Sequence, residues 1–504
     1  QFIFANMNLK SLLAKPFAGY IYNRVKKGME TALSDQEAIF KSLIKTGKST
    51  EFGKNHEFAS INNYEDFKAK VPVRDYEQLR PYIEKIKQGQ HNILWKGKPI
   101  YFAKTSGTTS GTKYIPITKD SIPNHINTAR DALMCYMAQS GNTAFAKGKM
   151  IFLSGSPELT RVGGIATGRL SGIVNHHVPR YLRSNQLPSY ETNCIEEWET
   201  KLDKIVEETF NEDMSLISGI PPWMQMYFDR LMEKSGKKVG ELFPNFSVMV
   251  QGGVNFEPYK TKLEASIGRK VDCIELFPAS EGFFAFQDQV NKPGLLLNTN
   301  SGIFFEFIPA AEAMNDAPTR LSLKDVKEGE NYALIISSNA GLWAYNIGDT
   351  VKFISTNPYR IVVTGRIKHY ISAFGEHVIG EEVEYAMMNA ASSNNVNVIE
   401  FTVAPMVQQG EGKSYHEWFV EAENLPADIH EFAMQIDNSL REKNTYYDDL
   451  INGNILQPLR LRFIRKNGFI DYMKSVGKLG GQNKLPRLSN DRKIADALSE
   501  YLLD

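Results

Sequence analysis

From residue 149 onward, short apolar runs alternate with longer amphipathic segments. Four of the apolar runs lead into Gly-, Ser- or Pro-bearing turns, and they lie at residues 150–153, 216–217, 248–250 and 273–276. The segments between them have helical periodicity, notably at 196–210 and 223–234. Strands alternating with helices predict an α/β sheet, in which ligands bind at the strand ends. We therefore expect several Gly- and Ser-bearing loops to meet at one crevice.

The two ends of the chain have different patterns. The first hundred residues predict mainly helices, for example at 35–46. After Gly365 and Arg366 the pattern predicts helices at 381–391, 427–441 and 491–503, and strands at 396–404, 415–421 and 460–464. This length is enough for a separate domain. We therefore expect an α/β protein with a large N-terminal domain, residues 1–366, and a smaller α+β C-terminal domain, residues 367–504.

Residues 105–113 read T-S-G-T-T-S-G-T-K and follow a short apolar run that predicts a strand. Glycine permits close backbone approach, hydroxyls donate hydrogen bonds to anionic oxygens and lysine adds a positive charge, so this composition suits a phosphate-binding loop. The common phosphate loop has four residues between its glycines and a lysine directly after the second. Here three residues separate Gly107 from Gly111, and Thr112 precedes Lys113. The alternative is a Ser/Thr/Gly surface linker.

Residues 277–282, F-P-A-S-E-G, follow a predicted buried strand and place a hydroxyl and a carboxylate on one turn. A carboxylate near a phosphate loop is repulsive unless a divalent cation lies between them, so the pair suggests ATP with Mg²⁺. One alternative is a helix N-terminus with Ser280 as its cap and Glu281 favoured by the helix dipole. Another is the nucleophile elbow of a hydrolase, which is disfavoured because Pro278 replaces the first glycine of that motif.

Three further positions carry candidate chemistry. Residues 345–350, Y-N-I-G-D-T, lie between two predicted strands, where Asp349 could accept ribose hydroxyls or occupy a plain hairpin turn. Arg366 ends the next predicted strand and could equally be a surface cation. Lys484 lies in a glycine-bearing basic loop at 480–487, where most lysines are solvated and inert.

Charge and cysteine content limit the classes of partner and compartment. The 58 basic and 58 acidic residues cancel, so there is no overall electrostatic case for nucleic acid or anionic membrane as a partner. No run of apolar residues is long enough to predict a membrane span. The three scattered cysteines predict neither a disulfide framework nor a zinc site, and we expect a cytoplasmic protein. We treat residues 1–6 as an upstream extension, because Met7 begins an ordinary protein start.

Five pieces of the chain form an ordered set that is more specific than any single member. They are the loop at 105–113, the turn at 277–282, the stretch at 345–350, Gly365 and Arg366 leading into 371–376, and the loop at 482–487. Residues 217–223 and 251–253 support the same pattern. The set resembles the acyl-adenylate-forming superfamily, most closely the auxin-responsive acyl acid amido synthetases of plants and their bacterial relatives. We expect a bacterial member.

The resemblance implies an N-terminal domain that binds ATP and a carboxylic acid, and a mobile C-terminal domain that rotates about Lys368 between two half-reactions. It implies nucleotide-binding roles for Ser106, Thr108, Thr109, Gly252, Gly253, Phe277, Ser280, Asp349 and Arg366. Of these, Phe277 matches the aromatic on adenine and Asp349 the ribose acid, with Arg366 as its neighbour. Glu281 and Lys484 match catalytic residues, Glu281 at the Mg²⁺ position and Lys484 at the α-phosphate and acyl carboxylate. The chain departs from the family with Phe277 in place of the usual Tyr, and with Asn483 where an aromatic is common.

The reaction that this resemblance implies needs no protein nucleophile. A carboxylate attacks the ATP α-phosphate to form an acyl-adenylate, and an amine, expected to be an amino acid, then forms the amide. Positive groups and hydroxyls placed where negative charge builds would lower the barrier. The acyl pocket is expected between residues 125–136 and the loops at 154–164 and 218–223. Alternatives are an acid-CoA ligase and a non-catalytic nucleotide-binding protein of the same fold.

Overall fold

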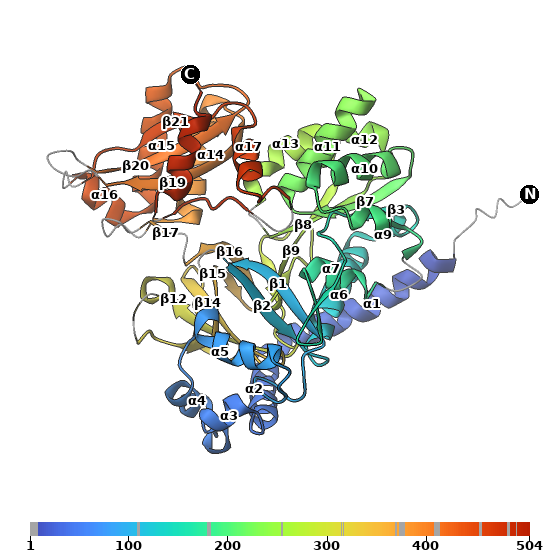
Figure 1. The fold of residues 1–504 in the computed structure, drawn as a ribbon. Coiled ribbons are helices and arrows are strands. Elements are labelled where there is room, and N and C mark those ends of the chain that lie inside the picture. Colours follow the sequence, from blue (N-terminus) through green and yellow to red (C-terminus); the bar gives the residue numbers. More distant parts are fainter. Residues whose placement is uncertain are drawn as a thin grey trace, which may run out of the picture.

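The computed structural model describes residues 9–107, 111–178, 183–253, 256–313, 315, 317–367, 370–371, 378–407, 414–452, 456–480, 484–489 and 491–503. Its N-terminal part is helical, as expected, and the helices between residues 32 and 87 lie low in Figure 1. The helices are α1 (Leu9–Glu30), α2 (Ala32–Gly47), α3 (Glu51–Asn55), α4 (Tyr64–Lys70) and α5 (Tyr76–Lys87). None of the helices in the described part of the chain has both the length and the apolar character needed to cross a bilayer.

The centre of the molecule is a sheet in which 12 strands pair among the described residues, in the order β13-β12-β14-β15-β16-β11-β10-β9-β8-β7-β3-β6. One half is parallel: β3 (Lys149–Phe152), β6 (Gln186–Leu187), β7 (Met214–Gly219), β8 (Val248–Gly252) and β9 (Asp272–Ala279). The other half is antiparallel: β10 (Gly282–Phe286), β11 (Leu295–Leu297), β12 (Ile303–Pro309), β13 (Leu321–Ser322), β14 (Asn331–Ser338), β15 (Tyr345–Thr356) and β16 (Tyr359–Arg366). The predicted α/β fold class is confirmed.

Both faces of the parallel half are covered by helices, and strand β8 shows why its sequence is continuously apolar. Val248 and Val250 share a core cluster with Tyr136 of α6 (Ile122–Ser140). Met249 belongs to a separate cluster, together with buried residues of α10 (Trp198–Thr209), α11 (Pro221–Ser235) and α13 (Glu257–Ile267). Successive strand side chains point to opposite faces, so a strand buried on both faces needs apolar residues at every position.

A second, smaller sheet contains residues 105–107 and 111–113, which corrects the expectation of a loop at 105–113. Strands β1 (Tyr101–Gly107) and β2 (Gly111–Ile117) pair antiparallel, with Gly107 opposite Gly111. Most of the segment is therefore a hairpin, and residues 108–110 lie outside the described residues. Strand β1 also pairs parallel with β5 (Ile165–Gly168), and β4 (Thr160–Val162) completes the sheet order β2-β1-β5-β4.

The C-terminal elements gather into a separate α+β unit, drawn in orange and red in Figure 1. A sheet in the order β19-β20-β21, formed by β19 (Val398–Met406), β20 (Tyr415–Ala422) and β21 (Arg460–Phe463), packs with α14 (Gly380–Asn394) and α15 (Ile429–Lys443). The sequence predicted these elements but missed α16 (Thr445–Asn452) and α17 (Gly468–Ser475). The expected final helix is shorter, α18 (Lys493–Leu498), and ends in a 3₁₀ turn. The proposed boundary after residue 366 falls at the end of β16.

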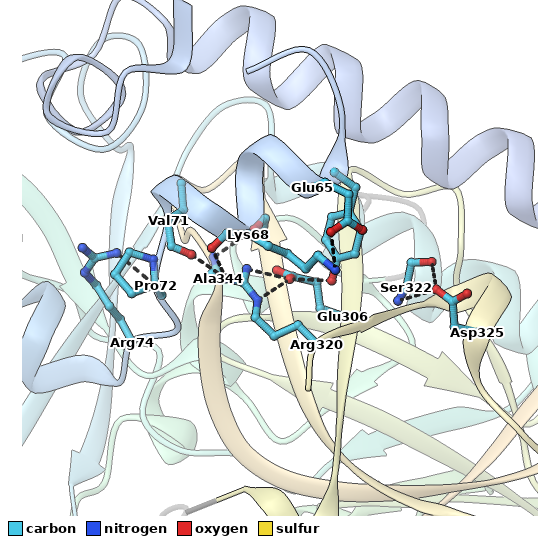
Figure 2. A network of polar contacts seen from close by, with 12 residues as sticks. Glu65, Lys68, Val71, Pro72, Arg74, Glu306, Arg320, Ser322, Asp325 and Ala344 are labelled. Atoms are coloured by element: carbon cyan, nitrogen blue, oxygen red, sulfur yellow. Dashed lines mark hydrogen bonds and ion pairs between the residues drawn. The ribbon is translucent and has the colours of Figure 1, made fainter. Parts of the chain in front are cut away.

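A buried ion pair ties the N-terminal helices to the antiparallel half of the sheet (Figure 2). Arg320 donates to Glu306 Oε1 through Nε, at 2.9 Å, and through Nη2, at 2.6 Å. Its Nη1 donates to the carbonyl of Val71, and the hydroxyl of Tyr64 donates to the same carboxylate at 2.9 Å. The side chain of Glu306 has no exposed surface and that of Arg320 is 7% exposed.

We expect Arg320→Met to lower the free energy of unfolding by about 3–5 kcal/mol, because it leaves the Glu306 carboxylate buried without its cation. The shift of the urea unfolding midpoint checks this. The control is the double variant Arg320→Met with Glu306→Leu, which removes both charges and should be less destabilised. A double variant as unstable as the single one would contradict the explanation.

Candidate active site

A cleft of about 3110 Å³ opens where the carboxyl ends of the parallel strands face the C-terminal unit. Its walls include Ser154 after β3, Gly219 at the end of β7, Gly252 at the end of β8 and Ala279 at the end of β9. The polar loops that follow these strands therefore share one crevice, as expected from the alternating sequence pattern. Residues 484–487 line the same cleft from the C-terminal unit.

Because Gly252 and Gly253 have no side chains, strand β9 and the side chain of Lys484 can come close to the backbone at the end of β8. A Cβ on Gly252 would lie 2.3 Å from the carbonyl oxygen of Leu276, so a side chain there would force β8 away from β9. Gly253 has a φ of +86°, and a Cβ on it would lie 3.1 Å from Lys484 Nζ. The ammonium group of Lys484 thus lies directly against the backbone that follows β8.

Ser280 and Glu281 form the turn of a β-hairpin, with Ala279 of β9 paired with Gly282 of β10. No helix follows, so the alternatives of a helix cap and of a strand-turn-helix nucleophile elbow are both wrong. Asn124 of α6 holds this turn, because its Oδ1 accepts a hydrogen bond from the backbone N–H of Phe283 at 2.7 Å. Both Ser280 and Glu281 line the cleft.

Phe277 presents little surface to the cleft that it lines. Its ring packs against Phe284 in a T-shaped contact, with 5.2 Å between centroids, and the residue is 7% exposed. A base lying here would meet the small exposed part of the ring. The adenine-contact role of Phe277 remains a prediction.

Asp349 lies in a bulge of β15, which corrects the expectation of a turn at residues 345–350. Ile335 pairs with Asn346 and Ala333 with Thr350, so the residues between them on β15 outnumber those on β14. Gly348 in this bulge has a φ of +87°, which glycine adopts without strain. Bulges re-aim side chains, and Asp349 lines the cleft.

The remaining expected nucleotide contacts are placed only in part. Arg366 pairs with Asp349 at the end of β16, and Ser106 lies in β1. The side chains of Arg366 and Ser106 are outside the part of the molecule that the structure describes. Thr108, Thr109 and Lys368 also lie outside the described residues. Thr105 and Lys113, which pair across the hairpin, line the cleft.

Helix α6 and the turns after β3 and β7 line another part of the cleft, where the acyl pocket was expected. His125 on this helix is 4% exposed, and burial lowers its pKa to about 4, so its imidazole is neutral at pH 7. Its Nδ1 has no hydrogen-bond partner among the described residues. Sequence reasoning did not single out this residue, since a buried histidine has no local sequence signal.

Comparison with protein families gives three matches along the chain. Residues 21–191 match the GH3 family N-terminal domain, residues 296–366 the GH3 family central domain and residues 381–493 the GH3 family C-terminal domain. Together they cover more than half of the chain.

Individual relatives agree with these matches. A jasmonoyl-L-amino acid synthetase of Nicotiana attenuata is 22% identical, over 90% of each chain, and an indole-3-acetic acid-amido synthetase of Arabidopsis thaliana is 22% identical, over 93% of this chain and 91% of its own. Among solved structures, the GH3.15 acyl acid amido synthetase superposes with a TM-score of 0.80 at 15% identity, covering 96% of each chain. A 2-hydroxyisobutyryl-CoA ligase superposes with a TM-score of 0.57 at 13% identity, covering 92% of this chain and 91% of its own.

The family matches, the fold and the relatives point to one enzyme class. The two solved structures share the fold of this chain across nearly its whole length. The chain belongs to the GH3 family and is an ATP-dependent, adenylate-forming ligase of the acyl acid amido synthetase class.

Proposed function

We propose that this enzyme activates an apolar carboxylic acid as its acyl-adenylate, with Lys484 and Glu281 as catalytic residues, and transfers the acyl group to an amino acid. The observation that carries the proposal is the position of Lys484, whose Nζ lies against Gly253 in the cleft that Glu281 and Asp349 also line. The ammonium group of Lys484, the carboxylate of Glu281 and the candidate ribose-binding residue Asp349 therefore line the same cleft. One relative is named as a jasmonoyl-L-amino acid synthetase and another as an indole-3-acetic acid-amido synthetase. These names support an amino acid as the acceptor.

In the first step the acid carboxylate would attack the α-phosphate and pyrophosphate would leave. Negative charge builds on the oxygens around this phosphorus, and the ammonium group of Lys484 would stabilise it. In the second step an amine would attack the acyl carbon and release AMP. A closed cleft would keep water from hydrolysing the intermediate.

Glu281 suits a magnesium site in which the protein and the nucleotide each supply ligands. Protein sites for Mg²⁺ often supply one or two carboxylates, with nucleotide phosphates and water as the other ligands. In the described part of the chain no group of three or more His, Cys, Asp or Glu side chains could hold a metal by itself, so the phosphates would have to contribute ligands. When bound, Mg²⁺ would neutralise phosphate charge.

The other expected contacts complete the proposed nucleotide site. Ser106, Thr108, Thr109 and Ser280 would bind phosphate, Phe277 and the backbone of Gly252 and Gly253 would contact the nucleotide, and Asp349 with Arg366 would bind ribose. We also propose the division at residues 366 and 367, with Lys368 as the hinge, and a cytoplasmic location.

The acyl tail would lie along the apolar wall between α6 and the sheet. Residues that line the cleft there and are only partly buried include Leu133, Met134, Phe152 and Leu276. A tail that covers these side chains gains about 25 cal/mol for each Å² of apolar surface removed from water. An acid with an aromatic or branched aliphatic tail fits this wall better than a short hydrophilic acid.

Exchange of labelled pyrophosphate into ATP over a panel of carboxylic acids tests the proposal. We expect exchange with aryl-alkanoic or branched aliphatic acids and amide products when amino acids are added. Chelation of Mg²⁺ should abolish exchange. The Lys484→Ala variant should lose exchange while binding ATP nearly as tightly as the wild type. No exchange with any acid, or a thioester as the product with CoA, would overturn the proposal.

Gly253→Ala should reduce pyrophosphate exchange by roughly an order of magnitude, because the new Cβ would lie 3.1 Å from Lys484 Nζ and would push the ammonium group a few tenths of an ångström away from its position. Gly236→Ala is the matched control, since Gly236 also has a positive φ but a Cβ added to it would have no neighbour within 4 Å. Both variants should lose similar stability in thermal unfolding, about 1–2 kcal/mol for a residue held in the left-handed region. Equal exchange rates in the two variants would contradict the role given to the Gly253 contact.

A further inference from the structure

The segment that carries Lys484 docks on the N-terminal part of the molecule at its start. Leu479 packs against the core cluster formed by α10, α11, β7 and β8. Gly480, with a φ of +77°, lies on Trp198 so closely that a Cβ would be 2.6 Å from the Cβ of that tryptophan. Trp198 in turn packs on Trp223, which lines the cleft.

The end of the same segment is held by Arg487 in the C-terminal unit. Its guanidinium pairs with Glu384 of α14 at 3.0 Å and with Glu400 of β19, and it lies over the ring of Phe401. The backbone is held as well, because the carbonyl of Arg487 accepts a hydrogen bond from the N–H of Val403 at 2.8 Å. Lys484 lies three positions before Arg487, a span of at most about 10 Å, so the position of one limits that of the other.

Tyr259 of α13 links this arginine cluster to the N-terminal part. Its hydroxyl donates to Glu400 Oε2 at 2.9 Å and accepts a hydrogen bond from Arg487 Nη2 at 3.3 Å. Burial raises the pKa of the Tyr259 hydroxyl, so it stays protonated and can donate. Glu400 thus binds Tyr259 of the N-terminal part as well as Arg487 of the C-terminal unit.

Other ion pairs across the junction are more exposed. Lys262 pairs with Glu423 at 3.1 Å and Lys474 with Glu199 at 2.7 Å, and all four side chains are about one-third exposed or more. Exposed pairs contribute little, whereas hydrogen bonds to charged groups are stronger, and the side chains of Arg487 and Glu400 are only 14% and 17% exposed. The junction of Tyr259, Glu400 and Arg487 is therefore the stronger polar link between Lys484 and the cleft.

We propose that Tyr259 and Arg487 are positioning residues that hold Lys484 in place for adenylation. The inference rests on the proposed two-step function. Tyr259 fixes where the C-terminal unit docks, and Arg487 transmits that position to Lys484 through the short segment between them. The junction favours the first half-reaction and is not needed for the second.

Tyr259→Phe removes only the hydroxyl and so tests this role. Pyrophosphate exchange should fall about tenfold in kcat with the KM for ATP nearly unchanged, the effect of losing one hydrogen bond to a charged group. Amide formation from a chemically prepared acyl-adenylate should stay the same. Equal losses in both half-reactions, or no loss in either, would overturn the inference.

Tyr227→Phe is the matched control, because the Tyr227 hydroxyl is also buried and donates to Thr209 within the N-terminal part. This control should leave the ratio of the two half-reactions unchanged; if it shifts the ratio as Tyr259→Phe does, the inference fails.

Hydrogen exchange gives a readout that does not depend on turnover. Amides of residues 478–480 and 484–489 should exchange several-fold faster in Tyr259→Phe than in the wild type or Tyr227→Phe, because docking of the C-terminal unit is weakened. Unchanged exchange in Tyr259→Phe would contradict the junction. Wild-type protein that lacks pyrophosphate exchange with every acid would instead contradict the proposed function, and the hydrogen-exchange result would still decide on the junction.

Discussion

The close approach of β8 and β9 at Gly252 is the constraint on which the cleft depends. A side chain at this position would meet the carbonyl of Leu276, so the two parallel strands could not run to the same edge. Because they do, Gly253 and the turn with Ser280 and Glu281 line the same cleft. The backbone of Gly253 in turn leaves room for Lys484, which comes from a distant part of the sequence. A glycine pair thus fixes where two parts of the chain can meet.

The local spacing of apolar residues was enough to predict most of the helices and strands. The apolar runs at the parallel strands and the periodicity of α10, α11, α14 and α15 identified these elements because each depends on burial of its own face. The predictions failed where pairing across strands decides the structure. Residues 105–113 look like a loop by composition, yet cross-strand pairing draws both ends of the segment into a hairpin. Asp349 looks like a turn residue, yet the bulge keeps it inside β15.

The candidate site could be predicted only as a set of motifs. Sequence order suggested that Glu281, Asp349 and Lys484 belong together, and the structure brings all three to one cleft. Tyr259 and His125 had no such signal, since a tyrosine on a helix and a buried histidine are ordinary features. Their surroundings depend on contacts between residues far apart in the sequence, such as the 2.9 Å bond from Tyr259 to Glu400.

In the proposed first step, the acid is activated by attack of its own carboxylate on the α-phosphate. The most direct test uses an acid whose carboxylate carries heavy oxygen, with ATP and an amino acid, followed by mass spectrometry of the products. We expect one heavy oxygen from the acid in AMP and the other in the amide. Heavy oxygen in inorganic phosphate, or AMP without the label, would contradict it.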